Sequence, residues 1–452
     1  MFRPFRVAIP AALAAAVAVM VPVGAQSLLV KFNDVKLKNG LRVIISEDHT
    51  APTVSIAVNY FVGSADEKAR RTGFAHLFEH MMFKGSENVG PGEHPALIFA
   101  NGGTMNGTTN EDRTLYFEQL PSNQLELGLF LEADRMKSLD INKANLDNQR
   151  GAVQEERRLR VDNQPYGQTF EKTGEQAYDN PAYKHSVIGS MEDLNAASVD
   201  DVATFFKTYY APNNAVLSIV GDVDTKKTMA MIEKYFGTIV RQPDPKRADL
   251  AEPAHTAERR STIDDPLARL PRLDIVWIGP PANTADSAAL DVLGTVLSGG
   301  RSARLNQVVV REKQLATSAA LFSADSKGPG LISAFASVAP NKKPEDVEAA
   351  LYEEIEKIKT GTIAEWEIEK AHNNARRAQA NQVTSTLNRA IQLGEYAMFF
   401  DDPNLINTRT DKILKVTAAD VQRVAKKYLT KENRSVIVTM PPKSGGTTGG
   451  QQ

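Results

Sequence analysis

The chain has 452 residues, 42% of them hydrophobic and 24% charged, values of an ordinary globular protein that exclude disordered and fibrous classes. Its formal net charge of -2 argues against a nucleic-acid partner recognised through phosphates. The absence of cysteine excludes a disulfide framework, a thiolate zinc site and a thiol nucleophile. Imidazole and carboxylate groups are therefore the strong metal ligands that remain.

The N-terminus has the pattern of an export signal. Two arginines precede an Ala/Val-rich apolar stretch, and Val23 and Ala25 have the small-residue spacing of a signal-peptidase site. We therefore expect residues 1–25 to be a signal peptide and the protein to be exported to the periplasm. An uncleaved membrane anchor is the alternative, although Pro10 and the polar residues that follow the stretch make it poor for spanning a bilayer.

The first predicted elements lead to a helix that carries two histidines. LKNGLRVIISED predicts the start of a hairpin and a strand, and APTVSIAVNYF from Ala51 predicts a second strand with alternating apolar positions. GFAHLFEHMMFKG has apolar residues at helical spacing and stops at Gly85. His76, Glu79 and His80 are therefore expected on one helix.

This helix has the residue pattern of a zinc site. Residues four apart project from the same face, so His76 and His80 can bind one ion while Glu79 borders the same site. Zinc accepts neutral imidazole and leaves a position for water when three protein ligands bind it. HLFEH is the inverted form of the common zinc-protease helix motif, with the glutamate where a general base is needed. The alternative is a pair of polar residues on the surface of an amphipathic helix.

A third ligand is expected from a helix further along the chain. NLDNQRGAVQEERRLRVDNQPYG has Leu146, Val153 and Leu159 for a buried face, and it carries Glu155 and Glu156. Adjacent helical positions are about 100° apart, so only one of the two glutamates is expected to face the metal. The spacing does not choose between them, and a solvated acidic pair is the alternative.

The sequence repeats itself weakly at one offset. Asp201 and Asp420, 219 residues apart, occupy matching places in SVDDVATFFKTYYAPNNAVLSIV and TAADVQRVAKKYLTKENRSVIVT. The same offset aligns APTVSIAVNYF with LPRLDIVWIGP near the start of each half. Each copy has the pattern of a helix, a polar turn and a buried strand, which predicts a duplicated α/β domain.

The repeat also indicates how the chain is divided. We expect a signal peptide over 1–25, an N-terminal catalytic zinc domain over 28–240, a Pro- and charge-rich linker over 241–260, a degenerate homologous domain over 261–441 and a disordered tail over 442–452. Thr295, Ser298 and Gly299 stand opposite the two histidines and the glutamate of the motif. The second copy is therefore expected to bind no metal.

HLFEH, followed by GGTMNGTTNEDRTLYFE and QRGAVQEERRLRVDNQPYG, resembles the zinc peptidase family that contains pitrilysin, insulin-degrading enzyme and the mitochondrial processing peptidase. The resemblance runs from about Val35 to Pro441 and is strongest to the short bacterial exported members. It implies an α+β fold of two homologous α/β domains, with helices packed on a mostly antiparallel sheet. Together the two domains would form half of a clamshell.

The resemblance also assigns roles in the zinc site. It implies one Zn²⁺ per chain held by His76, His80 and Glu156, with Glu79 as the general base, and so selects Glu156 over its neighbour. In the implied reaction, the metal polarises the scissile carbonyl and Glu79 takes the proton of the attacking water. The chain has Gln149 where the family often has a supporting glutamate.

The segment after the first GG pair resembles the family's substrate-binding edge strand. The resemblance places Asn106, Gly107 and Thr108 beside the scissile peptide, because an open strand edge can hydrogen-bond any peptide backbone. The alternative is a glycine-permitted turn and a core strand. Related chains carry an arginine, here Arg311, and a tyrosine seven residues later that grip the substrate, but this chain has Ser318 there. It therefore resembles the zinc-bearing subunit of a two-chain enzyme.

These observations predict a zinc metalloendopeptidase that hydrolyses short or unfolded peptides in an enclosed chamber. A homologous partner subunit is expected to supply the gripping residues in a heterodimer, with a homodimer as the alternative. No nucleic-acid partner and no stable membrane span are expected. A non-catalytic scaffold subunit and a processing peptidase for one substrate are the competing functions. The other histidines are interpreted as structural or surface groups: His49, His94, His185, His255 and His372.

Overall fold

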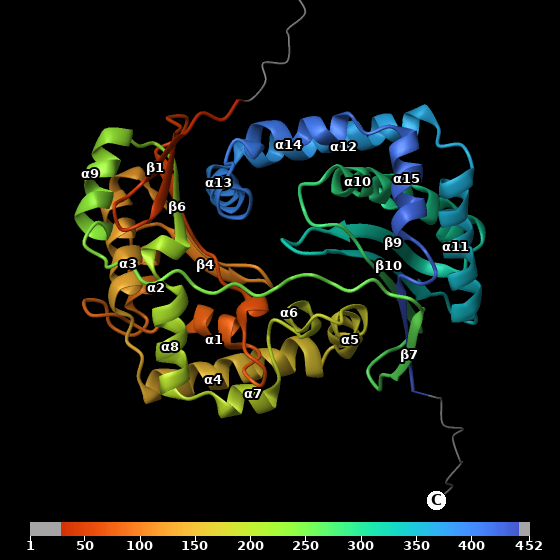
Figure 1. Cartoon of the computed structure of the whole chain (residues 1–452), viewed down its shortest axis with the longest axis horizontal. Helices are drawn as coiled ribbons and strands as arrows, with labels where there is room; N and C mark the ends of the chain where they lie inside the picture. Colours follow the sequence, from red (N-terminus) through yellow and green to blue (C-terminus); the bar gives the residue numbers. More distant parts are fainter. Residues whose placement is uncertain (1–28, 443–452) are drawn as a thin grey trace, which may run out of the picture.

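The computed structural model describes residues 29–442, which form two β-sheets with helices around them (Figure 1). The first sheet has the strand order β1-β2-β6-β3-β5-β4, and the second has the order β7-β11-β8-β10-β9. Neighbouring strands are antiparallel except for the parallel pairs β2 with β6 and β7 with β11. The predicted signal peptide and almost all of the predicted tail lie outside the described residues.

The strands and helices have the following bounds. The first sheet contains β1 (Asn33–Lys36), β2 (Arg42–Glu47), β3 (Thr53–Tyr60), β4 (Thr104–Thr109), β5 (Thr114–Pro121) and β6 (Ala215–Gly221). The second contains β7 (Arg259–Asp264), β8 (Arg272–Ile278), β9 (Ala316–Ala324), β10 (Leu331–Val338) and β11 (Arg434–Met440). The helices of the first half are α1 (Phe74–Met81), α2 (Glu93–Ala100), α3 (Leu125–Ser138), α4 (Lys143–Arg157), α5 (Gly167–Ala177), α6 (Pro181–Lys184), α7 (Met191–Ala196), α8 (Val199–Tyr209) and α9 (Thr225–Phe236). Those of the second half are α10 (Ala285–Ser298), α11 (Pro344–Thr360), α12 (Glu365–Thr384), α13 (Thr386–Phe400), α14 (Leu405–Leu414) and α15 (Ala418–Tyr428).

The predicted repeat appears as matching elements at the same offset. Helix α8 leads into β6, and helix α15, which begins 219 residues later, leads into β11. Both helices start with a capping box, in which the backbone N–H of Asp201 donates to the Ser198 hydroxyl and that of Asp420 donates to the Thr417 hydroxyl. The expected fold class, two homologous α/β units with helices packed on mostly antiparallel sheets, is confirmed.

The two halves exchange one helix each. Helix α13 packs on β3 and β6 of the first sheet, and its counterpart α5, again 219 residues earlier, packs on β8 and β11 of the second sheet. Leu393 and Ala390 of α13 are fully buried against Ala57 and Val220 of the first sheet. Each sheet therefore completes its apolar cover with a helix from the other half of the chain.

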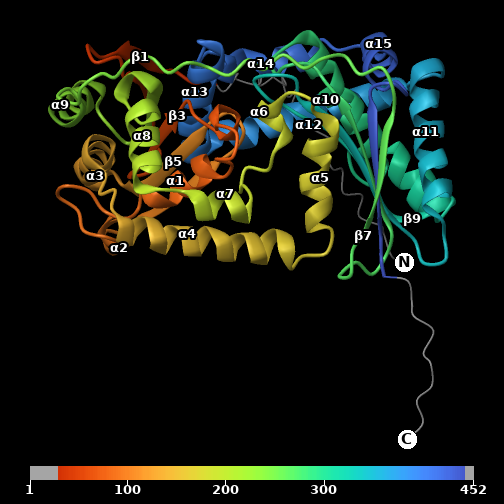
Figure 2. The same ribbon diagram turned by 60° about the horizontal axis from the view of Figure 1, so that its bottom comes forward.

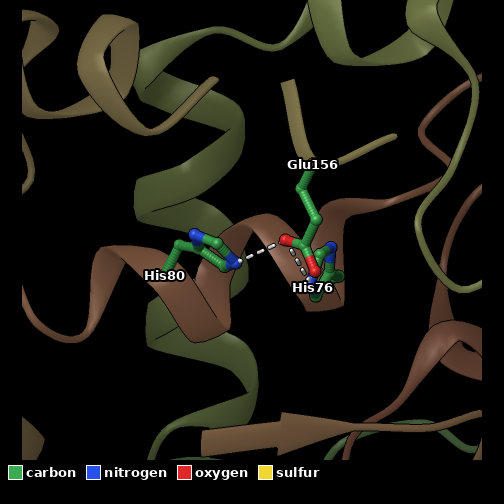
Figure 3. Close-up of side chains that lie close together, drawn as sticks. All are labelled: His76, His80 and Glu156. Atoms are coloured by element: carbon green, nitrogen blue, oxygen red, sulfur yellow. Dashed lines mark ion pairs between the residues drawn. The ribbon is translucent and has the colours of Figure 1, made fainter. Parts of the chain in front are cut away.

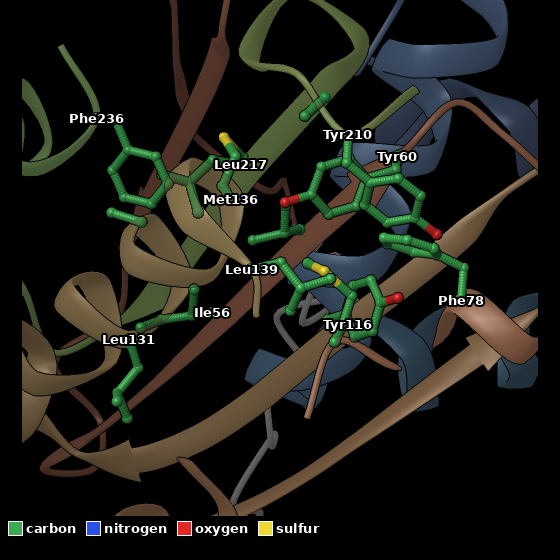
Figure 4. Close-up of a cluster of buried hydrophobic side chains, with 14 of the residues drawn as sticks. Ile56, Tyr60, Phe78, Tyr116, Leu131, Met136, Leu139, Tyr210, Leu217 and Phe236 are labelled. Carbon is green, nitrogen blue, oxygen red and sulfur yellow. The ribbon is translucent and has the colours of Figure 1, made fainter. Parts of the chain in front are cut away.

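Aromatic side chains fix helix α1 in the core of the first half. Figure 4 shows Phe78 next to Tyr60, Tyr116 and Tyr210, and the ring centroids of Phe78 and Tyr210 are 4.2 Å apart. All four side chains are almost completely buried. Because Phe78 lies between the two histidines of the motif in sequence, its packing also fixes the position of the helical turn that carries them.

Among residues 29–442, no helix is both long enough and apolar enough to cross a membrane.

We predict that Leu393→Ala destabilises the protein by about 2–5 kcal/mol, because it leaves a cavity between α13 and the first sheet. Denaturant unfolding measures the effect. Leu267→Ala is the matched control, since Leu267 is 42% exposed and should change the unfolding free energy by less than about 0.5 kcal/mol. Equal losses in the two variants would contradict the packing role of α13.

Candidate metal centre

A buried carboxylate holds the start of helix α1. Gly73 precedes the helix with a φ of 84°, and a Cβ atom there would lie 2.6 Å from the carbonyl oxygen of Ile188, so no capping side chain fits at this position. Glu67 takes the role of the missing capping side chain. Its carboxylate accepts hydrogen bonds from the backbone N–H groups of Gly73 and Ala75, at 2.9 and 2.8 Å. These bonds satisfy donors that a helix start leaves free.

His76, His80 and Glu156 lie together (Figure 3). The Nε2 atoms of His76 and His80 are 3.4 and 3.2 Å from the same oxygen, Oε2 of Glu156, which reaches them from α4. Two ligand atoms on a tetrahedral Zn²⁺ are separated by about 3.3–3.5 Å, given metal–ligand distances of about 2.0–2.2 Å. The three groups therefore fit a zinc ion in spacing and in ligand type.

The protonation states of these groups also fit a metal. Burial lowers the pKa of His76 to about 4, with a further contribution from His80, so its imidazole is neutral at ordinary pH. The pKa of Glu156 is lowered, first by its hydrogen bond with His80, so it is ionised. A neutral imidazole and a carboxylate are the forms that bind Zn²⁺. The Nδ1 atom of His76 is buried without a hydrogen-bond partner among the described residues.

The structure brings Glu156, and not Glu155, to the histidines. The Glu155 side chain is 57% exposed and pairs with Arg158 on the outer face of the helix. Glu156 is 16% exposed, and its second oxygen lies 2.8 Å from Nη1 of Arg160. Arg160 therefore holds Glu156 with one oxygen turned toward the two imidazoles.

The end of α4 differs from the sequence prediction. The helix passes after Arg157 into a π-helical turn, Arg158–Asp162, and Leu159, which was predicted to be buried, is 55% exposed. The wider turn shifts the register of the residues that follow Arg157, so the apolar spacing no longer marks one face. Arg157 itself binds Glu171 of α5 through two hydrogen bonds, which joins α4 to α5.

The side chain of Glu79 extends from α1 toward strand β4. The hydroxyl of Thr109 donates a 2.6 Å hydrogen bond to its Oε2 atom, and burial raises its pKa. A Cβ atom on Gly107 would lie 3.0 Å from Cγ of Glu79, so a larger residue there would press on this side chain. The carboxylate is therefore oriented by one hydroxyl and by the absence of a side chain on the facing strand.

Strand β4 forms the edge of the first sheet, as the resemblance implied. It pairs with β5, and its other edge has no strand partner within 29–442. Asn106, Gly107 and Thr108 all lie on this strand, and the Asn106 side-chain oxygen accepts a 2.9 Å hydrogen bond from the Gly107 N–H. Arg113 donates to the carbonyl and the hydroxyl of Thr108 and also pairs with Glu395 of α13, so the second half of the chain supports this strand.

A cavity of about 540 Å³ opens beside the three clustered groups. Its lining includes His76, Glu156 and Thr109, residues of α5, and residues 324–326 of the second half. Figure 2 shows how α5 stands between the end of α4 and the second sheet. The cavity therefore lies between the two halves of the chain.

Two predicted residues lie elsewhere. Arg311 is exposed on the π-helical turn Asn306–Glu312, and Ser318 is on β9, so neither lines the cavity described above. His185 lines the cavity, although the sequence indicated only a structural or surface group. Sequence reasoning also gave no role to Glu111, although it lies in a run of charged residues within the segment predicted to be the edge strand.

The remaining histidines lie outside this cavity. His94, with Glu118 and Glu132, forms a fully buried group within metal-binding distance, but Arg135 already binds both oxygens of Glu132. His49 and His255 lie beside carboxylates, and His372 contacts the backbone carbonyl of Val416. None of them lies near the cluster of Figure 3.

Known proteins resemble the chain over most of its length. The family model described as "Insulinase (Peptidase family M16)" matches residues 42–190, and "Peptidase M16 inactive domain" matches residues 196–375. "Zinc protease PqqE" of Helicobacter pylori is 29% identical over 422 residues, which are 92% of this chain and 94% of that protein. A "probable mitochondrial-processing peptidase subunit beta" of Arabidopsis thaliana is 24% identical and covers 87% of this chain and 75% of its own.

Solved structures share the fold. The crystal structure of a protease from Helicobacter pylori matches with a TM-score of 0.87 and 28% identity, over 91% of this chain and all of that chain. The periplasmic protease PqqL from Escherichia coli matches with a TM-score of 0.75 and 19% identity, over 91% of this chain but 47% of that longer chain. The chain belongs to the insulinase family of peptidases, family M16, with the insulinase model on its first half and the inactive-domain model on most of its second.

Proposed function

We propose that the chain is a zinc-dependent endopeptidase that uses His76, His80 and Glu156 as metal ligands and Glu79 as its general base. The observation that carries the proposal is the convergence of both imidazoles on one oxygen of Glu156 at tetrahedral ligand spacing. The relationship to proteins named zinc proteases supports it. One Zn²⁺ per chain is proposed, because the matching turn of α10 carries Thr295, Ser298 and Gly299.

The chemistry follows from the placement of Glu79. When bound, Zn²⁺ supplies a Lewis acid that polarises a peptide carbonyl and lowers the pKa of water. Glu79 accepts the proton of the attacking water and delivers it to the departing amine. Burial raises the pKa of Glu79 toward neutral pH, and a pKa near the working pH suits a group that both accepts and donates a proton. The Thr109 hydroxyl keeps one carboxylate oxygen in a fixed direction throughout.

The proposed substrate is a short or unfolded peptide that adds a strand to the free edge of β4. Backbone hydrogen bonds along this edge would give affinity with little sequence preference, and Asn106, Gly107 and Thr108 are the contact residues. The hydrogen bond from the Gly107 N–H to the Asn106 side chain occupies a donor that a peptide carbonyl could take. A folded protein cannot supply a free extended segment, which favours unfolded substrates.

The proposal includes a partner subunit and export. The match to 47% of a longer chain of the same fold supports a second homologous subunit that completes an enclosed chamber. The exposed position of Arg311 and the serine at position 318 support a partner that supplies the substrate-gripping residues. The N-terminal sequence pattern supports export to the periplasm.

Glu79→Gln is predicted to lower peptide hydrolysis by about 10²–10⁴-fold while zinc content stays at one ion per chain, because the base is lost and the ligands remain. Cleavage of a quenched peptide of roughly 10–30 residues, measured with and without a co-expressed partner, checks the rate. Elemental analysis checks the metal. Full activity in this variant would refute the assigned base.

Glu156→Gln is predicted to weaken zinc binding by more than about 100-fold, because an amide is a much poorer ligand than a carboxylate. Glu155→Gln is the matched control, since it removes the neighbouring carboxylate from the outer face of the same helix. Competition with a chelator measures both affinities. The reverse result, metal loss in the control alone, would show that Glu155 is the ligand.

The metal-free protein is predicted to lose stability as the pH falls from 6.5 to about 4, because His76 takes up its proton in the unfolded chain before it does in the folded one. Once the pH is below both pKa values, this single group lowers the free energy of unfolding by about 3 kcal/mol. His76→Gln should flatten the pH dependence of the unfolding free energy in this window. His49→Gln is the control, because the pKa of His49 is raised by Asp222 and its contribution has the opposite sign.

A further inference from the structure

The cavity beside the metal centre has carboxylates along its wall, and most of them are already paired. Glu156 binds Arg160, and Glu171 of α5 binds Arg157. Asp325, which lines the cavity from the second half of the chain, pairs with Arg409. Each of these carboxylates therefore has its charge balanced by an arginine of the same chain.

Glu111 is the exception. It follows β4 in the turn to β5 and lines the cavity; among residues 29–442 its carboxylate forms no ion pair, its own backbone N–H is its hydrogen-bond partner, and the charge of Arg113 acts on it from a distance. Its neighbours are both engaged: Asp112 accepts hydrogen bonds from the Tyr183 hydroxyl and the Lys327 N–H, and Arg113 pairs with Glu395. The one carboxylate of this wall that is outside an ion pair among the described residues thus lies two residues beyond Thr109, which orients Glu79.

The turn that carries Glu111 is held rigidly. The backbone oxygen of Glu111 accepts a 2.9 Å hydrogen bond from the Ala65 N–H. A Cβ atom on Gly63 would lie 2.3 Å from the same oxygen, so the two segments are in close contact. The side-chain oxygen of Asn110 accepts hydrogen bonds from the backbone N–H groups of Asp112 and Arg113, at 2.9 Å each. The carboxylate of Glu111 is therefore presented from a fixed backbone, largely shielded from water, and burial raises its pKa.

We propose that this cavity is the subsite for one substrate side chain next to the scissile bond, and that Glu111 makes it select lysine or arginine. The inference rests on the proposed peptidase function. The cavity wall also contains Phe170, Ile188 and Leu331, which suit the long aliphatic stem of a basic side chain, while its charged end reaches the carboxylate. Glu111 would be a specificity-determining residue and would take no part in bond cleavage.

The test compares peptides that differ at single positions around one cleavage site. Norleucine replaces lysine and citrulline replaces arginine as the neutral analogue. The value of kcat/KM is measured for each peptide with the wild type and with Glu111→Gln. The wild type should prefer the charged peptide by about 10- to 100-fold at one position, the effect of one shielded charge-assisted hydrogen bond. Glu111→Gln should bring the ratio near one, chiefly by slowing cleavage of the charged peptide.

A charge reversal and a matched control sharpen the result. Glu111→Lys should reverse the preference, so that a peptide with glutamate at the same position becomes the better substrate. Asp325→Asn removes a paired carboxylate from the same wall, and it should leave most of the preference in place. An equal loss of preference in this control would overturn the assignment to Glu111, because it would show that the general field of the cavity selects the charge. Thermal unfolding confirms that each variant is folded.

Peptide binding can be measured apart from peptide cleavage. Anisotropy of labelled peptides with the Glu79→Gln variant measures affinity without cleavage, so the preference for the basic peptide is read even if no turnover is seen. If the wild type cleaves charged and neutral peptides equally well, the subsite is wrong and the peptidase stands. If no peptide is cleaved but the basic ones bind more tightly, the peptidase function fails and the subsite stands.

Discussion

The exchange of α5 and α13 between the halves is the constraint on which the site depends. Helix α5 packs on the second sheet and at the same time forms the side wall of the cavity, while its residue Glu171 fixes the end of α4 through Arg157. Helix α13 covers the first sheet and supports β4 through Arg113. The helix pair that carries the proposed metal ligands, the edge strand and the cavity are thus positioned by elements of both halves.

Helix α1 of the first half buries polar side chains, whereas the matching helix of the second half buries mostly apolar ones. Helix α1 contains two buried polar groups, His76 and Glu79, whose desolvation is offset by Glu156 and by the Thr109 hydroxyl. The corresponding α10 is lined by apolar residues, and its Ser298 is bound to the backbone of β9. One fold therefore carries the proposed metal ligands in one copy and an apolar helix at the matching place in the other.

The sequence predicted what depends on local spacing. The 219-residue offset identified the matching α8 and α15 together with their capping boxes, and the four-residue spacing placed His76 and His80 on one helical face. It could not choose between Glu155 and Glu156 without the family resemblance, because adjacent helical positions differ only in direction. Tertiary packing decides that direction, and α4 turns Glu156 inward.

What the sequence could not predict depends on long-range contacts. Leu159 fits an apolar helical pattern, but the π-helical turn shifts its register and exposes it. The role of Glu111 depends on which arginines pair with the other carboxylates, and those partners lie as far away as Arg409. The packing of α5 on the second sheet joins segments about 100 to 270 residues apart, so no local pattern shows it.

The helix exchange has a consequence for how the chain folds. Thr386–Phe400 lies near the end of the chain, so during synthesis the β3 and β6 face that it covers is left without its partner until most of the protein has been made. Contacts of such long sequence separation carry a high loop-closure cost and slow the folding reaction. Because the edge strand β4 is held in part by α13, the proposed metal ligands and Glu79 reach their final geometry only once α13 has been synthesised.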